Sequence, residues 1–459
     1  MVVDLYLQNG LMVSEQGTFH GGIAIHDGIV TGLVREGERV EANQSIDLAG
    51  KIILPGVVDG HVHFHDPGRA YWEGYRTGSM AAAAGGITTV IEMPLNGIPP
   101  TIDRPKLIEK REKIDGRAVV DYAHWAGLVD DNLDEMQDLA DAGVVAFKAF
   151  MSGAATEEFT GIQDRQLYGG LLKTAQLGTV LGLHAENGSV IEYLEAKLQS
   201  EGRCDPAAWL ESRPPVTELD AIQRALFWAE QTGGNAHIVH VSLEEGVRAV
   251  CAAKAAGVNV SVETCPHFLV FSEEDFLQQG AELKCDPPLR PKDEVERLWA
   301  AVLERQVDVI ASDHAPCRVE DKLQGDGDIW QAWAGVTGIQ SMLPAIWDEG
   351  VQKRELPMTE VVRMLCANPA RLFGLYPKKG ALLPGSDADL VVLDPQAAKM
   401  LKAEDLLNKN KHSPYVGRRL HGIVAQTYVR GRCVYDRGRI LVDPGHGRLI
   451  AQRARYKPF

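Results

Sequence analysis

The sequence predicts a (β/α)8 TIM-like barrel joined to a small β-sandwich domain that both ends of the chain build together. Through the middle of the chain, short apolar runs alternate with stretches rich in Ala, Leu and Glu, which is typical of repeated βα units. The two ends instead show short apolar runs separated by Gly and Asp turns. With 459 residues, the chain has room for a barrel of about 250 residues and a second domain.

Strand-like runs at both ends predict the smaller domain. Asp27-Gly28 is a hairpin signal, Asn9-Gly10 predicts a break, and Gly431 marks a turn between the last two runs. The predicted strands are residues 2–7, 22–26 and 29–33 at the first end and residues 389–394, 423–429 and 432–435 at the second. We therefore expect residues 1–52 and 380–459 to form one composite domain around a barrel of residues 53–379. Two separate flaps are the alternative.

Eight apolar runs predict the strands of the barrel. They are Val57–His63, Ile87–Met93, Val119–Leu128, Val144–Phe150, Val180–His184, His237–Val241, Val258–Glu263 and Val307–Ser312. Helix-like sequence follows each run, as a barrel requires. A doubly wound open sheet is the competing architecture. It is disfavoured because no Gly-rich nucleotide loop follows the first run.

Composition and charge narrow the class of partner. The net charge of −16 disfavours binding to nucleic acid. Seven scattered cysteines without a C-x-x-C pair disfavour disulfides and cysteine zinc sites, and fit a reducing cytoplasm. No run of 18 apolar residues predicts a membrane span, and the first residues lack the pattern of a signal peptide. We expect a cytoplasmic protein that acts on a small molecule, not on a membrane or a nucleic acid.

Two histidines close the first predicted barrel strand, in the segment Asp59-Gly-His-Val-His63. Side chains two residues apart on a strand point to the same face. His61 and His63 can therefore converge on one metal ion. The alternative is that they are two unrelated polar residues at the end of a strand.

Similar polar residues recur in the other predicted strands. Lys148 lies within the fourth, His184 and His240 end the fifth and sixth, and Asp313 follows the eighth. Each has an ordinary explanation: a histidine can belong to the core, a lysine can reach solvent and an aspartate can cap a helix. Their recurrence at the strand ends that form the catalytic face of a barrel favours a shared site instead. Imidazole and carboxylate ligands suit zinc and similar divalent ions.

The chain resembles the cyclic amidohydrolases of the amidohydrolase superfamily, which include dihydroorotases, hydantoinases and allantoinases. The resemblance covers essentially the whole chain. The matching motifs are Asp59-Gly-His-Val-His63, Gly85-Gly-Ile-Thr-Thr-Val-Ile-Glu-Met-Pro94, Phe147-Lys148, His184-Ala-Glu186, His240-Val-Ser242, Glu263-Thr-Cys-Pro-His267, Pro287-Pro-Leu-Arg290, Ser312-Asp313-His314-Ala-Pro316 and Gly385-Ser-Asp-Ala-Asp-Leu390.

The resemblance implies two divalent metal ions, with zinc expected first and cobalt, manganese or iron also compatible. His61, His63 and Asp313 would hold one ion, and His184 and His240 the other. Lys148, carboxylated by carbon dioxide, would bridge the ions together with a hydroxide. Asp313 would be the catalytic residue that takes the proton of the attacking hydroxide and returns it to the leaving ring nitrogen. The product would be a ring-opened N-carbamoyl acid.

Residues beside the predicted ligands indicate the substrate. Dihydroorotases usually carry an arginine two residues after the second histidine, where this chain has His65. Hydantoinases usually carry a tyrosine shortly after the lysine, where this chain has Phe150-Met-Ser152-Gly153. The segments 63–75, 92–96, 330–335 and 412–418 are instead similar to those of allantoinases. The resemblance therefore implies hydrolysis of allantoin to allantoate in purine breakdown.

Two alternatives stay open: another cyclic amidase, either a dihydroorotase or a hydantoinase, and a non-catalytic structural relative. All six ligand positions are filled, which disfavours the second. Relatives of this family are commonly homotetramers, so an oligomer is expected.

Allantoin is neutral and rich in amide groups, so its site should offer hydrogen-bonding groups and not a strong cation. By family position, the candidate substrate contacts are Asn96, Ser152, Cys285, Asp286, Pro287, Ala334, Gly335 and Arg69. For each, a turn or a loop brace is the alternative role, and for Arg69 it is the favoured one. His267 and His314 are expected to support the site, and Trp72, Trp330 and Trp333 to form core or wall.

Overall fold

The computed structural model describes residues 2–153, 156–451 and 456, and its strands form two sheets. Eight parallel strands make the barrel, in the spatial order of the chain. They are β6 (Val57–Val62), β7 (Ile87–Glu92), β8 (Asp121–Gly127), β9 (Ala146–Phe150), β10 (Leu181–His184), β11 (Ala236–Ile238), β12 (Val260–Thr264) and β13 (Val309–Ile310). Each lies within one of the predicted runs or extends it by one residue. The predicted barrel is therefore confirmed.

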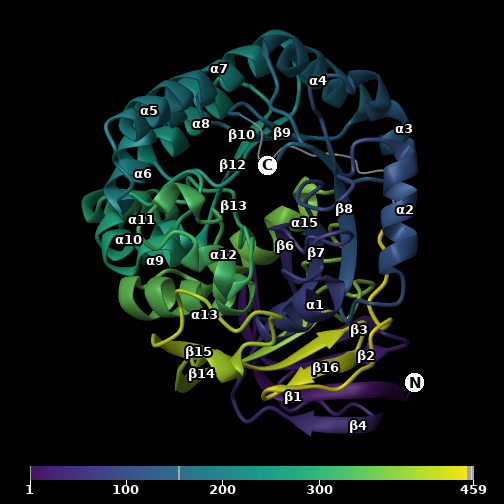
Figure 1. The fold of residues 1–459 in the computed structure, drawn as a ribbon. Coiled ribbons are helices and arrows are strands. Elements are labelled where there is room, and N and C mark those ends of the chain that lie inside the picture. The colour runs from purple at the N-terminus through teal and green to yellow at the C-terminus, as the bar shows by residue number, and fades with distance from the viewer. Residues whose placement is uncertain (1, 154–155, 452–455, 457–459) are drawn as a thin grey trace.

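Helices surround this barrel, and α2 to α8 form its outer rim in Figure 1. The longer ones are α1 (Tyr75–Ala84), α2 (Arg104–Ile114), α4 (Asp164–Leu177), α5 (Gly188–Ser200), α7 (Pro215–Thr232), α8 (Glu244–Ala255) and α11 (Lys292–Leu303). The shorter ones are α3 (Met136–Asp141), α6 (Pro206–Ser212), α9 (Pro266–Val270), α10 (Glu273–Gln279), α12 (Val319–Leu323), α13 (Met342–Ile346), α14 (Met358–Val362) and α15 (Asn368–Leu372). Helices on the outside leave the strands buried on both faces, so even the polar residues within them are buried.

Single-turn and π-helical segments complete the connections between these elements. They are η1 (Leu133–Glu135), η2 (Gly280–Leu283), η3 (Ile329–Gln331), η4 (Ile339–Ser341), η5 (Trp347–Gln352), η6 (Arg363–Ala367) and η7 (Ala403–Asp405). The helix ends follow ordinary capping chemistry. Helix α7, for example, has proline at its first position and ends at Gly233, whose φ of 64° is left-handed.

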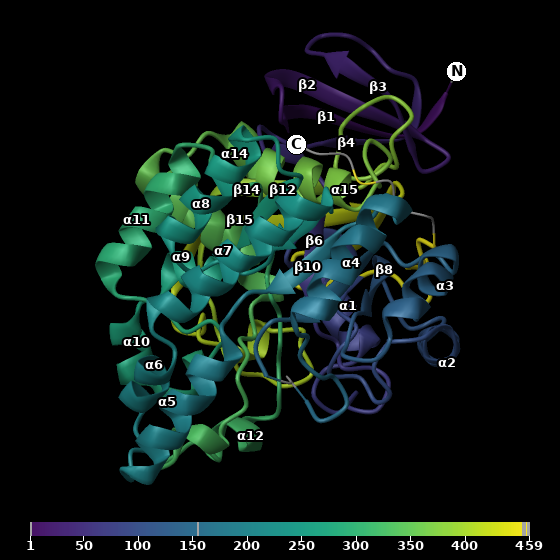
Figure 2. The same cartoon turned by 90° about the horizontal axis from the view of Figure 1, so that it is seen from above.

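The second sheet draws strands from both ends of the chain. Its order is β17-β16-β15-β14-β5-β1-β2-β3, with β4 also paired to β1. The strands are β1 (Val3–Ser14), β2 (Gly17–His26), β3 (Ile29–Arg35), β4 (Ala42–Asp47), β5 (Ile52–Pro55), β14 (Leu390–Met400), β15 (Arg419–Val429), β16 (Arg432–Asp436) and β17 (Arg439–Ile440). Antiparallel pairing of β5 with β14 joins the two ends. Figure 2 shows this sheet beside the barrel. One composite sheet, not two flaps, is therefore present, while the domain borders stay a prediction.

Two turns in the N-terminal strands differ in how well they were predicted. Asp27 and Gly28 have φ values of 52° and 75° and join β2 to β3, as the hairpin signal predicted. The break predicted at Asn9-Gly10 is wrong, because β1 continues through it. The register against β2 shifts between Leu7 and Gly10, and Asn9 has a φ of 58°. The segment forms a β-bulge, which bends a strand without ending it.

A buried cluster of charges connects the barrel to the second sheet. The Lys379 ammonium donates to Asp121 of β8 at 2.6 Å and to Asp389 at 2.7 Å, and lies 2.9 Å from Asp387. Arg430, between β15 and β16, also donates to Asp121. Burial alone would raise the pKa of Asp121, but Lys379 and Arg430 outweigh it and lower the pKa. The two cations thus keep the buried Asp121 carboxylate ionised.

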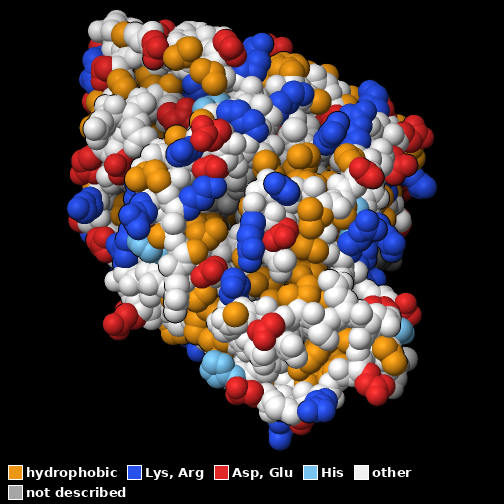
Figure 3. All heavy atoms as spheres, turned by 90° about the horizontal axis from the view of Figure 1, so that it is seen from below, with side chains coloured by type: hydrophobic (Ala, Val, Ile, Leu, Met, Phe, Trp, Pro, Cys, Tyr) orange, Lys and Arg blue, Asp and Glu red, His pale blue; other side chains and the backbone are white. Residues whose placement is uncertain are grey.

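The hydropathy of the helices and the charges on the surface bear on membrane and nucleic-acid binding. Among the helices of the described chain, none has both the length and the hydropathy that crossing a bilayer requires. On the face drawn in Figure 3, acidic and basic side chains are interspersed and apolar side chains lie between them. This face presents no continuous basic patch.

We expect Lys379→Met to destabilise the protein by about 3–5 kcal/mol, because it leaves buried carboxylates without their cation. Without that cation, burial raises the pKa values of the aspartates. The aspartates then contribute favourably to the free energy of unfolding below their unfolded pKa of about 4, and this contribution is lost as the pH rises. The deficit relative to the parent should therefore be larger at pH 7.5 than at pH 5, as measured by urea unfolding.

The matched control for this experiment is Lys399→Met, which removes a half-exposed lysine paired with Asp405. An exposed pair contributes about 0.5 kcal/mol or less. Equal effects of the two substitutions would contradict a structural role for the Lys379 cluster.

Candidate metal centre

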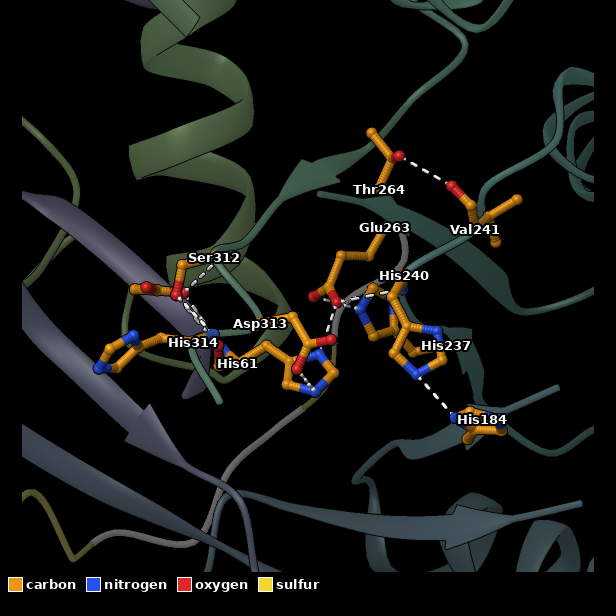
Figure 4. Close-up of polar contacts among 12 residues, drawn as sticks. His61, His184, His237, His240, Val241, Glu263, Thr264, Ser312, Asp313 and His314 are labelled. Carbon is orange, nitrogen blue, oxygen red and sulfur yellow. Dashed lines mark hydrogen bonds and ion pairs between the residues drawn. The ribbon is translucent and has the colours of Figure 1, made fainter. Parts of the chain in front are cut away.

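The barrel brings the six predicted metal ligands into one cavity of about 580 Å³. They come from five different strands or from the residues that follow them, all at the carboxyl end of the barrel. Figure 4 shows four of them converging, with their partners. The six residues lining the cavity are His61, His63, Lys148, His184, His240 and Asp313. The structure thus assembles side chains that lie up to 252 positions apart in the sequence.

His61, His63 and Asp313 form the first group of donor atoms. Asp313 Oδ1 lies 3.1 Å from His61 Nε2 and 3.2 Å from His63 Nε2. One ligand atom from each residue falls within 4.8 Å of the other two. Two imidazoles and a carboxylate at this spacing can bind one divalent cation.

His184 and His240 form the second group. His184 Nδ1 lies 3.0 Å from His240 Nε2. The ring of His240 is also 5.5 Å from that of His61, so the two groups adjoin. Two ring nitrogens that face each other inside a cavity can share a cation in the same way.

Lys148 lines the same cavity as these two groups. Its side chain is fully buried and its Nζ has no hydrogen-bond partner among the described residues. Burial lowers the pKa of Lys148 to about 8. Its positive charge also contributes to the low pKa values of both His63 and His240, which places it near both groups. An unpaired amine at this position is costly unless another group satisfies it.

Two glutamates fix the orientation of the histidine rings. Glu263 Oε1 lies 2.8 Å from His61 Nδ1, and Glu186 Oε2 lies 2.8 Å from His184 Nε2. An ionised carboxylate can only accept a hydrogen bond, so the contacted nitrogen carries the proton. His61 Nε2 and His184 Nδ1 are left with lone pairs directed toward the cavity. Carboxylate–histidine pairs of this kind orient metal ligands in proteins.

The structure adds a role for Glu263 that sequence analysis did not assign. It is the last residue but one of β12, the seventh strand, at the same end of the barrel as the predicted ligands, and also contacts His237 Nε2 at 3.3 Å (Figure 4). Although burial acts to raise it, the two histidines lower the pKa of Glu263 to about 2. Its position near the end of a buried strand was the signal that could have revealed it.

Burial keeps several of the histidines neutral. It lowers the pKa of His63 to about 4 and that of His240 well below its ordinary value. For Asp313, burial would raise the pKa, but the charge of His61 and the hydrogen bond with His63 outweigh it and hold the pKa low. Neutral imidazoles and an ionised carboxylate are the forms that bind cations.

A second set of possible ligands shares Asp313 and includes Cys265 and His267. Burial raises the pKa of the Cys265 thiol well above its ordinary value, which disfavours the thiolate that a metal needs. The group with His61 and His63 is therefore the better match to a divalent cation. His267 and His314 stay predicted supports, and His314 Nδ1 indeed accepts from the backbone of Gly338 at 3.3 Å.

Most predicted substrate contacts line the same cavity as the metal donors. They are Asn96, Ser152, Cys285, Asp286, Ala334 and Gly335. Arg69 and Pro287 are not among the lining residues. Arg69 instead donates to the backbone oxygen of Asn96 at 3.1 Å and pairs with Glu158, which is the bracing role favoured from the sequence.

His65 is buried behind the cavity wall. Its ring packs edge-on against Trp72 at 5.1 Å and Trp333 at 6.4 Å, and both tryptophans line the cavity. Burial lowers the pKa of His65 well below its ordinary value. His65, two residues after the second histidine, therefore offers no cation to a substrate.

One part of the cavity wall was predicted only in part from the sequence. Arg213, Glu195 and Asp286 meet there, and only Asp286 was predicted to lie in the site. Arg213 follows helix α6 and Glu195 lies in helix α5, so no strand-end pattern points to them.

Comparisons with known proteins agree with this geometry. The amidohydrolase family matches residues 52–434. An allantoinase of Rubrobacter xylanophilus is 42% identical over 97% of this chain and 97% of its own length. An allantoinase of Solibacter usitatus is 38% identical over 98% and 97%. Among solved structures, an L-hydantoinase (dihydropyrimidinase) from Arthrobacter aurescens superposes with a TM-score of 0.96 at 35% identity, covering 98% of this chain and 100% of that one.

We expect Glu263→Gln to weaken metal binding by about 10–100-fold, because an amide no longer fixes the proton on His61 Nδ1. The measurement is the metal content of the protein at equilibrium with a competing chelator of known affinity. Glu294→Gln is the matched control, since Glu294 is a buried carboxylate that pairs with Arg297 outside the cavity. Unchanged metal affinity in Glu263→Gln would refute the orienting role.

Proposed function

The chain belongs to the amidohydrolase family, and we propose that it hydrolyses the hydantoin ring of allantoin to give allantoate. It is a metal-dependent cyclic amide hydrolase of the allantoinase type. The choice of allantoin rests on one observation above all. Among the described residues that line the cavity, the single arginine, Arg213, is already paired with Glu195 and Asp286. A neutral substrate fits such a cavity better than one that carries a carboxylate.

The donor atoms described above fit two divalent cations. In this proposal His61, His63 and Asp313 hold one, and His184 and His240 hold the other. When bound, such cations would lower the pKa of a bound water and polarise the scissile carbonyl. The unpartnered amine of Lys148, in the same cavity as the two groups, supports a bridging role for this residue.

Asp313 moves the proton during the reaction. Its carboxylate faces the first histidine pair and lines the cavity. It accepts a proton from the attacking water as the oxygen bonds to the ring carbonyl carbon. It then delivers that proton to the ring nitrogen as the carbon–nitrogen bond breaks. The ring opens to a carboxylic acid and an N-carbamoyl group, and the acid then releases its proton to solvent as a carboxylate, so atoms and charge balance.

The remaining predicted contacts bind the ring. Asn96, Ser152 and the backbone around Cys285–Pro287 and Ala334–Gly335 offer donors and acceptors to its amide groups. Asn96 also lies 3.4 Å from His63 Nδ1, which places it at the border between ring and metal groups. Such groups favour a substrate that satisfies them and reject one that leaves them unpaired.

Further parts of the proposal rest on the family resemblance. The metal would be zinc, and Lys148, carboxylated to a carbamate, would help to hold both ions. The protein works in the cytoplasm as a homotetramer. The hydantoinase fold of the solved relative makes a hydantoinase or dihydropyrimidinase the second candidate function.

A panel of ring substrates tests the proposed function. On metal-loaded protein, kcat/KM for allantoin should exceed that for dihydroorotate, dihydrouracil and hydantoin by about a hundredfold or more. Asp313→Asn should lower the allantoin value by about 10²–10⁴-fold, because no group then moves the proton. If kcat/KM for hydantoin or dihydrouracil is higher than that for allantoin, the second candidate function is the correct one.

We expect Lys148→Ala to lose most bound metal and most activity, because the residue that would help to hold both ions is gone. If the bridge is a carbamate, short carboxylic acids such as acetate should partly restore both the metal content and the rate. Metal analysis and turnover with and without acetate measure this. Retention of full activity by the variant would remove the bridge from the mechanism.

A further inference from the structure

Arg213 and Glu195, which sequence analysis missed, form one wall of the cavity together with Asp286, and we call it the charged wall. All three residues line the cavity that also holds the predicted metal ligands. They come from three places in the chain: the end of α6, the middle of α5 and the loop after η2. Ring opening as described above uses none of these side chains.

Arg213 is held rigidly within this wall. Its guanidinium carbon lies 3.5 Å from the centre of the Trp209 ring, and its Nη1 donates to Ser212 Oγ at 2.8 Å. Trp209 is itself fixed, because its indole N–H donates to the backbone oxygen of Cys285 at 3.2 Å. Only 10% of the Arg213 side chain is exposed. A cation stacked and hydrogen-bonded in this way is preorganised.

The two carboxylates of the charged wall remain accessible from the cavity. Glu195 Oε1 lies 2.7 Å from Arg213 Nη1, and Asp286 Oδ1 lies 2.8 Å from Arg213 Nε. Their side chains are 27% and 31% exposed. One arginine and two carboxylates give the wall a net charge of −1, and Glu192 and Asp321 also line the cavity. The wall therefore presents fixed hydrogen-bond acceptors to whatever enters.

The charged wall borders the second histidine group. Glu186 accepts from His184 Nε2 at 2.8 Å and lines the cavity. Although burial acts to lower it, the nearby charges of Asp286, Glu186 and Glu195 raise the pKa of Arg213. Glu186, the wall and His184 therefore all face the same cavity. A ring placed at the metal groups can extend a substituent onto the wall.

We propose that the charged wall is the subsite for a ureido substituent on the substrate ring and that it selects for this group. The inference deepens the proposed function and rests on it. A ureido group offers three N–H donors and one carbonyl acceptor. Asp286 and Glu195 accept its N–H groups, while Arg213, which has five N–H donors, also donates to its carbonyl.

The charged wall also explains why related cyclic amides would be poorer substrates. A ring carboxylate, as in dihydroorotate, would approach two fixed carboxylates and be repelled. An unsubstituted ring, as in hydantoin, leaves the wall without its partner and gains nothing from it. The wall thus acts on the substituent and not on the scissile bond. A purely structural role, in which Arg213 only joins the loop at Asp286 to helix α5, is the competing explanation.

Kinetics on two substrates separate these explanations. We compare kcat/KM for allantoin and for unsubstituted hydantoin, using the metal-loaded full chain and the variants Asp286→Asn and Glu195→Gln. Both substitutions keep the size of the side chain and remove its charge. The control is Glu211→Gln, because Glu211 also pairs with an arginine, Arg203, but does not line the cavity.

We expect each single variant to lower kcat/KM for allantoin about tenfold and the double variant to lower it about a hundredfold. For hydantoin, kcat/KM should change less than twofold. The double variant should also have a smaller ratio of kcat/KM for allantoin to kcat/KM for dihydroorotate. Glu211→Gln should leave both substrates unchanged. Hydantoin turnover and metal content report whether each variant is folded.

Equal losses on allantoin and hydantoin would overturn the ureido subsite and support a structural role for the wall. Unchanged kinetics on both substrates would overturn it as well. Neither outcome touches the proposed function, which fails separately if the parent protein does not turn over allantoin. If Asp286→Asn does not fold, Glu195→Gln on helix α5 carries the same comparison.

Discussion

Closure of the barrel between its first and last strands is the constraint on which the site depends. The backbone N–H of His63 donates to the oxygen of His314 at 2.8 Å, and Val62 pairs with His314 in a parallel bridge. Asp59 strengthens this seam, because it accepts from the backbone N–H of Ser312 at 3.1 Å. Burial raises the pKa of Asp59 to about 7. The seam sets His61 and His63 beside Asp313, which lies 250 residues further along the chain than His63.

The closed barrel also holds backbone conformations that an isolated segment would avoid. His240 and Asp313 have φ values of 42° and 43°, and Asn96 has 67°. A non-glycine residue in the left-handed region costs about 1–3 kcal/mol. Hydrogen bonds on both sides of Asp313, from Ser312 to Asp59 and from His63 to His314, hold it there. The free energy of barrel folding thus offsets the cost of these backbone conformations, which direct the predicted ligand side chains into the cavity.

The sequence was sufficient for the parts of this arrangement that local patterns encode. Each of the eight strands was predicted because buried parallel strands are apolar and end in polar residues. The grouping of the six candidate ligand residues around one cavity could be predicted because they lie in or just after those strands. Glu263 also lies near the end of a buried strand, but it was not recognised as the partner of His61. The two residues lie two strands apart in the barrel, so no spacing in the sequence links them. The charged wall could not be predicted, because Arg213 and Glu195 lie on helices that meet only after packing.

The segment between β14 and β15 shows how the second sheet is coupled to the site. Asn408 donates to Glu73 at 3.1 Å and lies 3.3 Å from His314 Nε2. Asn410 donates to the backbone oxygen of Trp72 at 2.6 Å, and Trp72 lines the cavity.

His412 extends the same coupling to the opposite side of the cavity. Its Nε2 donates to the backbone oxygen of Cys317 at 2.8 Å, and its Nδ1 lies 3.0 Å from Glu282, just before the loop that carries Asp286. Burial acts to lower the pKa of His412, but Glu282 outweighs it and raises the pKa. A segment outside the barrel therefore fixes the loops that carry Trp72 and Asp286. The barrel provides the ligands, and the chain that returns from the second sheet holds the walls around them.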